Sequence, residues 1–66
     1  MGLYVKLEAA EGGIEAYICK AYVVAIEGIR LPDCDYECSR IVIDDGRFFN
    51  AKGSIDDVAR KMGFIE

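Results

Sequence analysis

Alternation of apolar and polar residues marks two strands at the start of the chain. In residues 3–9, Leu, Val, Leu and Ala alternate with Tyr, Lys and Glu, so one face is apolar and the other polar. The alternation resumes at residues 14–18, after Glu-Gly-Gly at residues 11–13. Because glycine adopts the positive φ angles of tight turns, the two segments are predicted to form a β-hairpin. Tyr4 and Tyr17 lie on the polar faces and are expected to be exposed.

The next apolar segment, "YVVAIEGI" at residues 22–29, is apolar on both faces and rich in β-branched residues. This composition predicts a central strand that is covered on both sides or runs through a barrel. Pro32-Asp33 then predicts a turn, because the proline ring presets φ and the aspartate bonds back to the backbone.

Residues 41–49, "IVIDDGRFF", predict a second hairpin with two competing turn geometries. A two-residue type I′ loop at Asp45-Gly46 would put Phe48 on the face of Ile43. A longer type I turn, with Gly46 in the left-handed position of a G1 bulge, would turn Phe48 away from that face. We favour the longer turn because it gathers four apolar side chains on one face: Ile41, Ile43, Phe49 and Ala51.

The last part of the chain predicts a helix. Ser54 is placed to cap it by accepting a hydrogen bond from the amide of Asp57, and apolar residues at 55, 58, 59 and 62 form one stripe. Gly63 is expected to end the helix, with Phe64 folding back over it. The predicted fold is therefore α+β, with an antiparallel sheet of about five strands and one C-terminal helix, in a single domain spanning residues 1–66.

A weak resemblance accompanies this pattern. The segments "YVVAIE", "IVIDDGR" and "GSIDDVARKMG", within residues 22–63, resemble the small FlbD-type flagellar-regulatory family and similar short bacterial and phage proteins. Those proteins share an apolar strand ending in Ile-Glu, a strand with an Asp-Gly or Asn-Gly turn, and a Ser-capped C-terminal helix. The chain departs from them at "NAKG", and the resemblance implies no catalytic residues.

The side chains argue against catalysis. The chain has no histidine to act as a general base or to activate its serines and cysteines, and it has no glycine-rich phosphate loop. Its three cysteines are an odd number, and the spacing of "CDYEC" without histidine does not complete a tetrahedral metal site. We expect no enzyme activity, no cofactor and no metal, with the cysteines as free thiols.

The charge points to a protein partner. A net charge of −4 disfavours direct nucleic-acid binding. Residues 33–57 hold seven acidic and three basic residues, so one end or edge of the fold is expected to be negative and to attract a basic protein surface. Two simpler interpretations stay open: an acidic rim that only keeps the protein soluble, and tyrosines that only support strand formation. The candidate protein-binding residues are Asp33, Asp35, Glu37, Asp44, Asp45, Tyr4, Tyr17 and Tyr36.

No apolar run reaches the roughly 20 residues of a membrane helix, and the N-terminus does not resemble a signal peptide, so we expect a cytoplasmic protein that does not enter a membrane. We predict a non-catalytic protein-binding module. In size and charge it is similar to phage anti-defence inhibitors of the anti-CRISPR type, which suggests that it occupies a basic surface of its target. The alternative is a homo-oligomeric regulatory or assembly subunit of the FlbD type, and the small core leaves a homodimer open.

Overall fold

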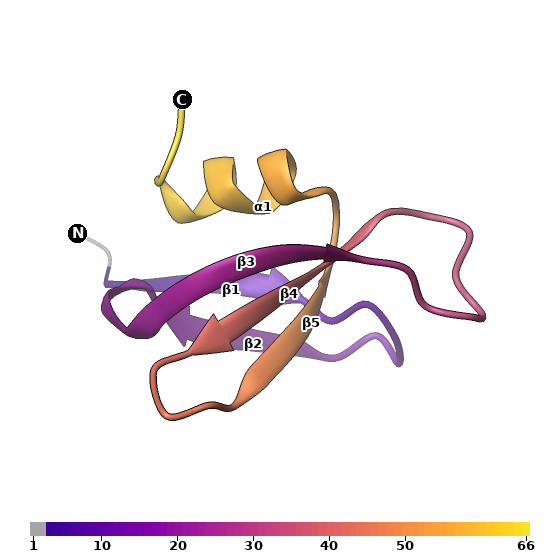
Figure 1. Cartoon of the computed structure of the whole chain (residues 1–66), viewed down its shortest axis with the longest axis horizontal. Coiled ribbons are helices and arrows are strands. Elements are labelled where there is room, and N and C mark those ends of the chain that lie inside the picture. Colours follow the sequence, from indigo (N-terminus) through magenta and orange to yellow (C-terminus); the bar gives the residue numbers. More distant parts are fainter. Residues whose placement is uncertain (1–2) are drawn as a thin grey trace.

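The computed structural model describes residues 3–66 and confirms the α+β class. These residues form five strands, a 3₁₀ helix and one C-terminal α-helix (Figure 1). The elements are β1 (Tyr4–Glu8), β2 (Glu15–Cys19), η1 (Lys20–Tyr22), β3 (Val23–Ile29), β4 (Cys38–Ile43), β5 (Phe48–Lys52) and α1 (Ile55–Met62).

The strands do not form the single sheet that the sequence predicts. They form an antiparallel pair, β1–β2, and a three-stranded antiparallel sheet in the order β3–β4–β5. The chain passes from β2 into β3 through the three-residue helix η1, and β3 pairs with β4 instead of β2. The two sheets meet instead beside β1, where Ala9 forms an isolated bridge with Ala51 and the Ala10 amide donates to the Asn50 carbonyl at 2.9 Å.

The β1–β2 hairpin has the predicted inner and outer faces. Leu7 and Ile18 are buried, and the turn places Gly12 and Gly13 at φ angles of 79° and 64°. Leu3 and Ile14 continue the apolar alternation but lie beyond the ends of the strands, where both are more than 60% exposed. The inner face therefore extends only as far as the strand pairing does.

The prediction of a central strand at residues 22–29 is wrong, because β3 is an edge strand and β4 is central. Ile26 packs against the core, and α1 lies along β3 (Figure 1). The apolar character of β3 therefore reflects a helix packed on one face of the strand, and not a neighbouring strand at each of its edges. A register shift between Val23 and Ala25, as at a β-bulge, interrupts its pairing with β4.

The β4–β5 hairpin has the register that we favoured. The Gly46 amide donates to the Ile43 carbonyl at 2.9 Å, and the Ile43 amide donates to the Arg47 carbonyl at 2.8 Å. Gly46 adopts a φ of 93°, as a G1 bulge requires. Phe49 therefore packs against the core beside Ile41, while Phe48 points outward and is mostly exposed.

The helix has both predicted caps. Ser54 Oγ accepts from the Asp57 amide at 3.1 Å, and Gly63 has a left-handed φ of 82°. The Phe64 amide donates to the Ala59 carbonyl at 2.9 Å, as in a Schellman motif. Val58, Ala59 and Met62 are buried, and Val58 and Met62 complete a core shared with both sheets. Residues 3–66 contain no helix with the length and apolar character that a membrane span requires.

Candidate protein-binding surfaces

The loop between β3 and β4, residues 30–37, carries the first group of candidate residues. It begins with the predicted turn, in which Pro32 takes the second position and the Cys34 amide donates to the Leu31 carbonyl at 3.1 Å. The Tyr36 hydroxyl donates to the Ala10 carbonyl in the β1–β2 turn. The Glu37 carbonyl accepts from the Gly53 amide at 2.9 Å, at the entry to α1. The loop is therefore fixed on two sides.

The thiols beside this loop take part in the same attachment. Cys34 Sγ lies 3.9 Å from the Ala10 carbonyl oxygen, and Cys38 Sγ lies 3.7 Å from that of Tyr36. A hydrogen bond with Cys34, together with burial, raises the pKa of Tyr36 to about 12. Burial, and then the neighbouring Cys34, raises the pKa of the Cys38 thiol. All three cysteines are free, and residues 3–66 bring no three candidate ligand side chains together as a metal site.

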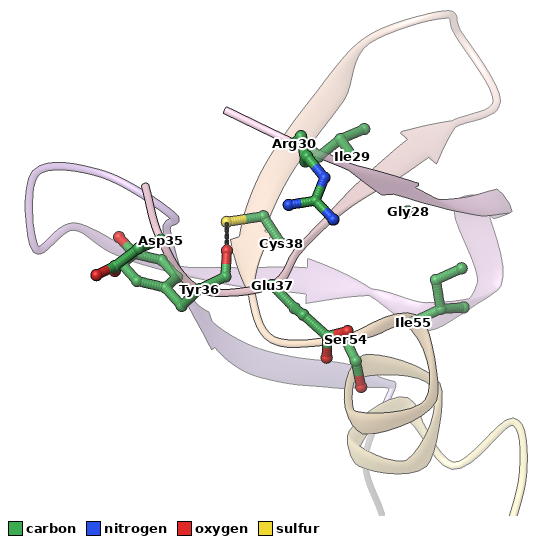
Figure 2. Close-up of a pocket in the computed structure, with 9 residues that line it drawn as sticks. All are labelled: Gly28, Ile29, Arg30, Asp35, Tyr36, Glu37, Cys38, Ser54 and Ile55. Atoms are coloured by element: carbon green, nitrogen blue, oxygen red, sulfur yellow. Dashed lines mark hydrogen bonds between the residues drawn. The ribbon is translucent and has the colours of Figure 1, made fainter. Parts of the chain in front are cut away.

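An open pocket of about 470 Å³ lies between this loop, the end of β3 and the start of α1 (Figure 2). We call it the acidic pocket and define it by Gly28, Arg30, Asp35, Glu37 and Ile55. In Figure 2 the Glu37 side chain points toward the start of α1, while Arg30 lies on the opposite side of the pocket. Glu37 thus brings a carboxylate near the partly apolar floor, whereas Asp35 lies at the outer edge of the pocket, beside Tyr36.

Glycine at position 28 keeps that floor open. A Cβ atom at Gly28 would lie 3.1 Å from Ile55 Cδ1, which is closer than most side chains tolerate. Ile55, the first residue of α1, is 43% exposed and forms an apolar wall of the pocket. Gly28 of β3 therefore lies beside Ile55 of α1, which is the one residue of the predicted apolar stripe that remains exposed.

The carboxylates of the acidic pocket have no cationic partner within the described residues. The ion pairs of residues 3–66 join Lys6 to Glu15, Arg47 to Asp45 and Arg60 to Asp57. The ammonium of Lys52, in β5, lies 4.9 Å from the centre of the Tyr36 ring rather than on a carboxylate. Asp33, Asp35 and Glu37 therefore keep their charge available to a partner.

A second open pocket, of about 380 Å³, lies at the other end of the strands. Five aromatic residues line it, and we call it the tyrosine groove after the four that are exposed: Tyr4, Tyr17, Tyr22 and Phe48. These rings are between 55% and 68% exposed, whereas Ile18 beneath them is buried. The groove lies between the open ends of β1 and β2, the helix η1 and the β4–β5 turn, opposite the acidic loop (Figure 1).

The structure divides the predicted site residues between these two surfaces. Asp35, Tyr36 and Glu37 line the acidic pocket, with Asp33 in the same loop, whereas Tyr4 and Tyr17 line the tyrosine groove. All eight are exposed. The acidic residues of the segment 33–57 do not form one negative surface. The strand β4 separates the loop that holds Asp33, Asp35 and Glu37 from the turn that holds Asp44 and Asp45.

The two turn aspartates have different surroundings. The Asp45 carboxylate accepts from the Arg47 amide at 3.0 Å and from its guanidinium at 2.8 Å, and these contacts lower the pKa of Asp45. Asp44 makes no ion pair within residues 3–66, and its amide donates to the Tyr22 carbonyl at 2.9 Å. Of the two turn aspartates, Asp44 is therefore the one without an ion pair, and its backbone adjoins Tyr22 of the tyrosine groove.

Several lining residues were not predicted. Gly28, Arg30 and Ile55 belong to the acidic pocket, and nothing in the local pattern singles them out. Phe48 belongs to the tyrosine groove, and here a signal existed, because the favoured hairpin register already turned it outward.

No protein-family model matches the chain, and no curated protein or solved structure matches it. The proposals below rest on the geometry of the chain's own residues.

Proposed function

We propose that this protein is a non-catalytic protein-binding module that docks through the acidic pocket onto a basic surface of another protein. The observation that carries the proposal is the pairing of two uncompensated carboxylates, Asp35 and Glu37, with a partly apolar pocket. An acidic surface intended only for solubility needs no pocket beside it.

The pocket suits a lysine or arginine side chain in particular. Such side chains combine an apolar stem with a charged head. The stem would lie against Ile55 and over Gly28, while the head would meet Glu37 in a charge-assisted hydrogen bond and Asp35 would add to the negative field at the outer edge. Attachment of the loop at Ala10 and Gly53 holds the carboxylates in place, so little entropy is lost when a partner binds.

Occupation of a basic surface is also a means of inhibition. A small acidic protein that covers a nucleic-acid channel competes with nucleic acid for the same cationic side chains. We therefore favour an inhibitor of the anti-CRISPR type over a regulatory subunit, since the unpaired carboxylates of an open pocket suit a basic surface of a different protein.

The test compares two variants of equal net charge. Asp35→Asn/Glu37→Gln removes the pocket carboxylates, and Glu8→Gln/Glu66→Gln removes two exposed carboxylates that line neither pocket. The wild-type protein and both variants are used to capture partners from extracts of the native host, and the association rate of each recovered protein is then measured in purified form.

We expect the pocket variant to associate several-fold more slowly at low ionic strength and with a weaker salt dependence. The control variant should keep most of the wild-type rate. Equal association of the wild type and the pocket variant at both low and high salt would overturn the proposal.

A further inference from the structure

The tyrosine groove is a second exposed feature that the proposed function does not use. Its rings come from four separate places in the chain: β1, β2, η1 and β5. Tyr4 pairs with Cys19 and Tyr17 pairs with Lys6, so the two tyrosines are diagonal neighbours on one face of the hairpin. Tyrosine offers large contact area with few rotatable bonds, which favours its use in recognition.

The hydroxyl groups of the groove are available to a ligand. Among the described residues, the only tyrosine hydroxyl that makes a hydrogen bond is that of Tyr36, outside the groove. Tyr4, Tyr17 and Tyr22 therefore present phenolic donors above apolar ring faces. A ligand with its own unpaired carbonyl groups would satisfy both features.

The area of the groove favours a peptide over a second copy of the chain. An aromatic side chain contributes about 150–250 Å² when buried, so four rings more than half exposed offer on the order of 500 Å². A stable protein–protein interface needs about 800 Å² from each partner. The groove falls short of that value but can accommodate a few residues of an extended segment.

We propose that the tyrosine groove binds a proline-rich segment of a partner protein in the polyproline II conformation. Such a segment has no internal hydrogen bonds, so its carbonyl groups are free to accept from tyrosine hydroxyls, and its rings stack on aromatic faces. It also loses little conformational entropy on binding because it is extended beforehand.

Charge at the rim defines the segment further. The guanidinium of Arg47 is already paired with Asp45 at 2.8 Å, whereas Asp44 has no cationic partner within residues 3–66. Lys20 of η1 has its ammonium near Gly63, at the end of α1, so Asp44 offers the unpaired charge that complements a basic residue flanking the prolines. The inferred ligand is a proline-rich segment with an adjacent arginine or lysine.

The experiment is a titration of the isotope-labelled full chain, followed by NMR. The probes are a ten-residue proline peptide, the same peptide with one flanking arginine, and a Gly-Ser peptide of equal length. We expect the two proline peptides to shift the amide signals of Tyr4, Tyr17, Tyr22 and Phe48, while the Gly-Ser peptide leaves them unchanged. The arginine-flanked peptide should bind about 1.4- to fivefold more tightly, in line with about 0.2–1 kcal/mol for one exposed ion pair.

Three variants assign the contacts. Tyr17→Ala should weaken binding at least tenfold, and Tyr17→Phe should weaken it by less because the ring remains. Asp44→Asn should remove the preference for the arginine-flanked peptide without changing the affinity for the unflanked one. The amide spectrum of each variant without peptide shows whether the fold is intact.

Absence of shifts at millimolar peptide, or shifts that map outside the groove, would overturn the inference. So would sedimentation of the wild type as a dimer that Tyr17→Ala dissociates, because a second copy would then cover the groove. None of these results depends on the acidic pocket, so the two proposals can fail separately.

Discussion

The hydroxyl of Tyr36 donates a hydrogen bond to the main-chain carbonyl of Ala10, which lies 26 residues earlier in the chain. This contact joins the loop between β3 and β4 to the turn of the β1–β2 hairpin, and so connects the two sheets at the acidic end of the molecule. It also explains why a tyrosine predicted as an exposed contact residue is only 40% exposed.

Replacement of Tyr36 by phenylalanine should lower the melting temperature, because the Ala10 carbonyl keeps only the weaker contact with the Cys34 thiol while the ring remains. Hydrogen exchange of the turn amides at residues 11–13 should accelerate. Tyr17→Phe is the matched control, since its hydroxyl makes no hydrogen bond within residues 3–66, and it should leave both quantities unchanged. An equal effect of the two substitutions would contradict the structural role of Tyr36.

Ionisation of the same residue should make stability depend on alkaline pH. The pKa of Tyr36 is raised from 10.0 to about 12, mainly by the hydrogen bond with Cys34. The folded state therefore favours the neutral phenol, and the linked stabilisation is complete below 10.0 and is lost as the pH rises toward about 12. The measurement is the phenolate absorbance as a function of pH, and the difference between the wild type and Tyr36→Phe gives the titration of Tyr36 alone. A midpoint at 10.0 would show that the hydrogen bond has no such effect.

The three thiols should react with a thiol reagent at different rates. Cys38 is 2% exposed, and its raised pKa leaves a smaller thiolate fraction near neutral pH, so it should react most slowly. Cys38→Ala should remove the slow phase of the reaction. In denaturant without reducing agent all three thiols should be titrated, and a lower number would reveal a disulfide.

The parts of the fold that depend on neighbouring residues were predictable from the sequence. The register of the β4–β5 hairpin follows from Gly46 in the turn together with the apolar alternation on either side. The helix boundaries follow in the same way from Ser54 and Gly63. Each of these features is decided by side chains within a few residues of the backbone that they constrain.

The pairing of distant segments was not predictable by the same means. A strand that is apolar on both faces can be covered by another strand or by a helix, and the composition of residues 22–29 does not distinguish the two. The break between the sheets coincides with η1, which the chain enters immediately after β2, and no proline or glycine marks that position.

The candidate surfaces were predictable only in part. Exposure of Tyr4 and Tyr17 followed from strand alternation. The separation of the acidic residues was overlooked, although a strand of six residues spans about 20 Å and must place the loops before and after it at opposite ends. The pocket floor at Gly28 and Ile55 joins a strand to a helix and required the folded structure.

Removal of the helix cap should destabilise the fold without affecting binding. Ser54→Ala deletes the acceptor of the Asp57 amide and should cost about 1 kcal/mol in the free energy of unfolding. Ser54→Asp keeps an acceptor at this position and should restore most of that loss. Chemical denaturation measures both, and an unchanged midpoint for the alanine variant would show that water replaces the cap.

Neutralisation of Arg30 should have the opposite effect on partner binding from loss of the acidic residues. Its guanidinium lies in the acidic pocket (Figure 2) and makes no ion pair within residues 3–66, so it opposes the field of Asp35 and Glu37 without holding either in place. Arg30→Gln should therefore accelerate association with a basic partner several-fold at low salt and make the salt dependence steeper. Lys61→Gln removes an equal charge from the exposed end of α1 and should change the rate less. Equal acceleration by the two substitutions would mean that the partner responds to net charge alone, whereas slower association of Arg30→Gln would place Arg30 itself in contact with an acidic group of the partner.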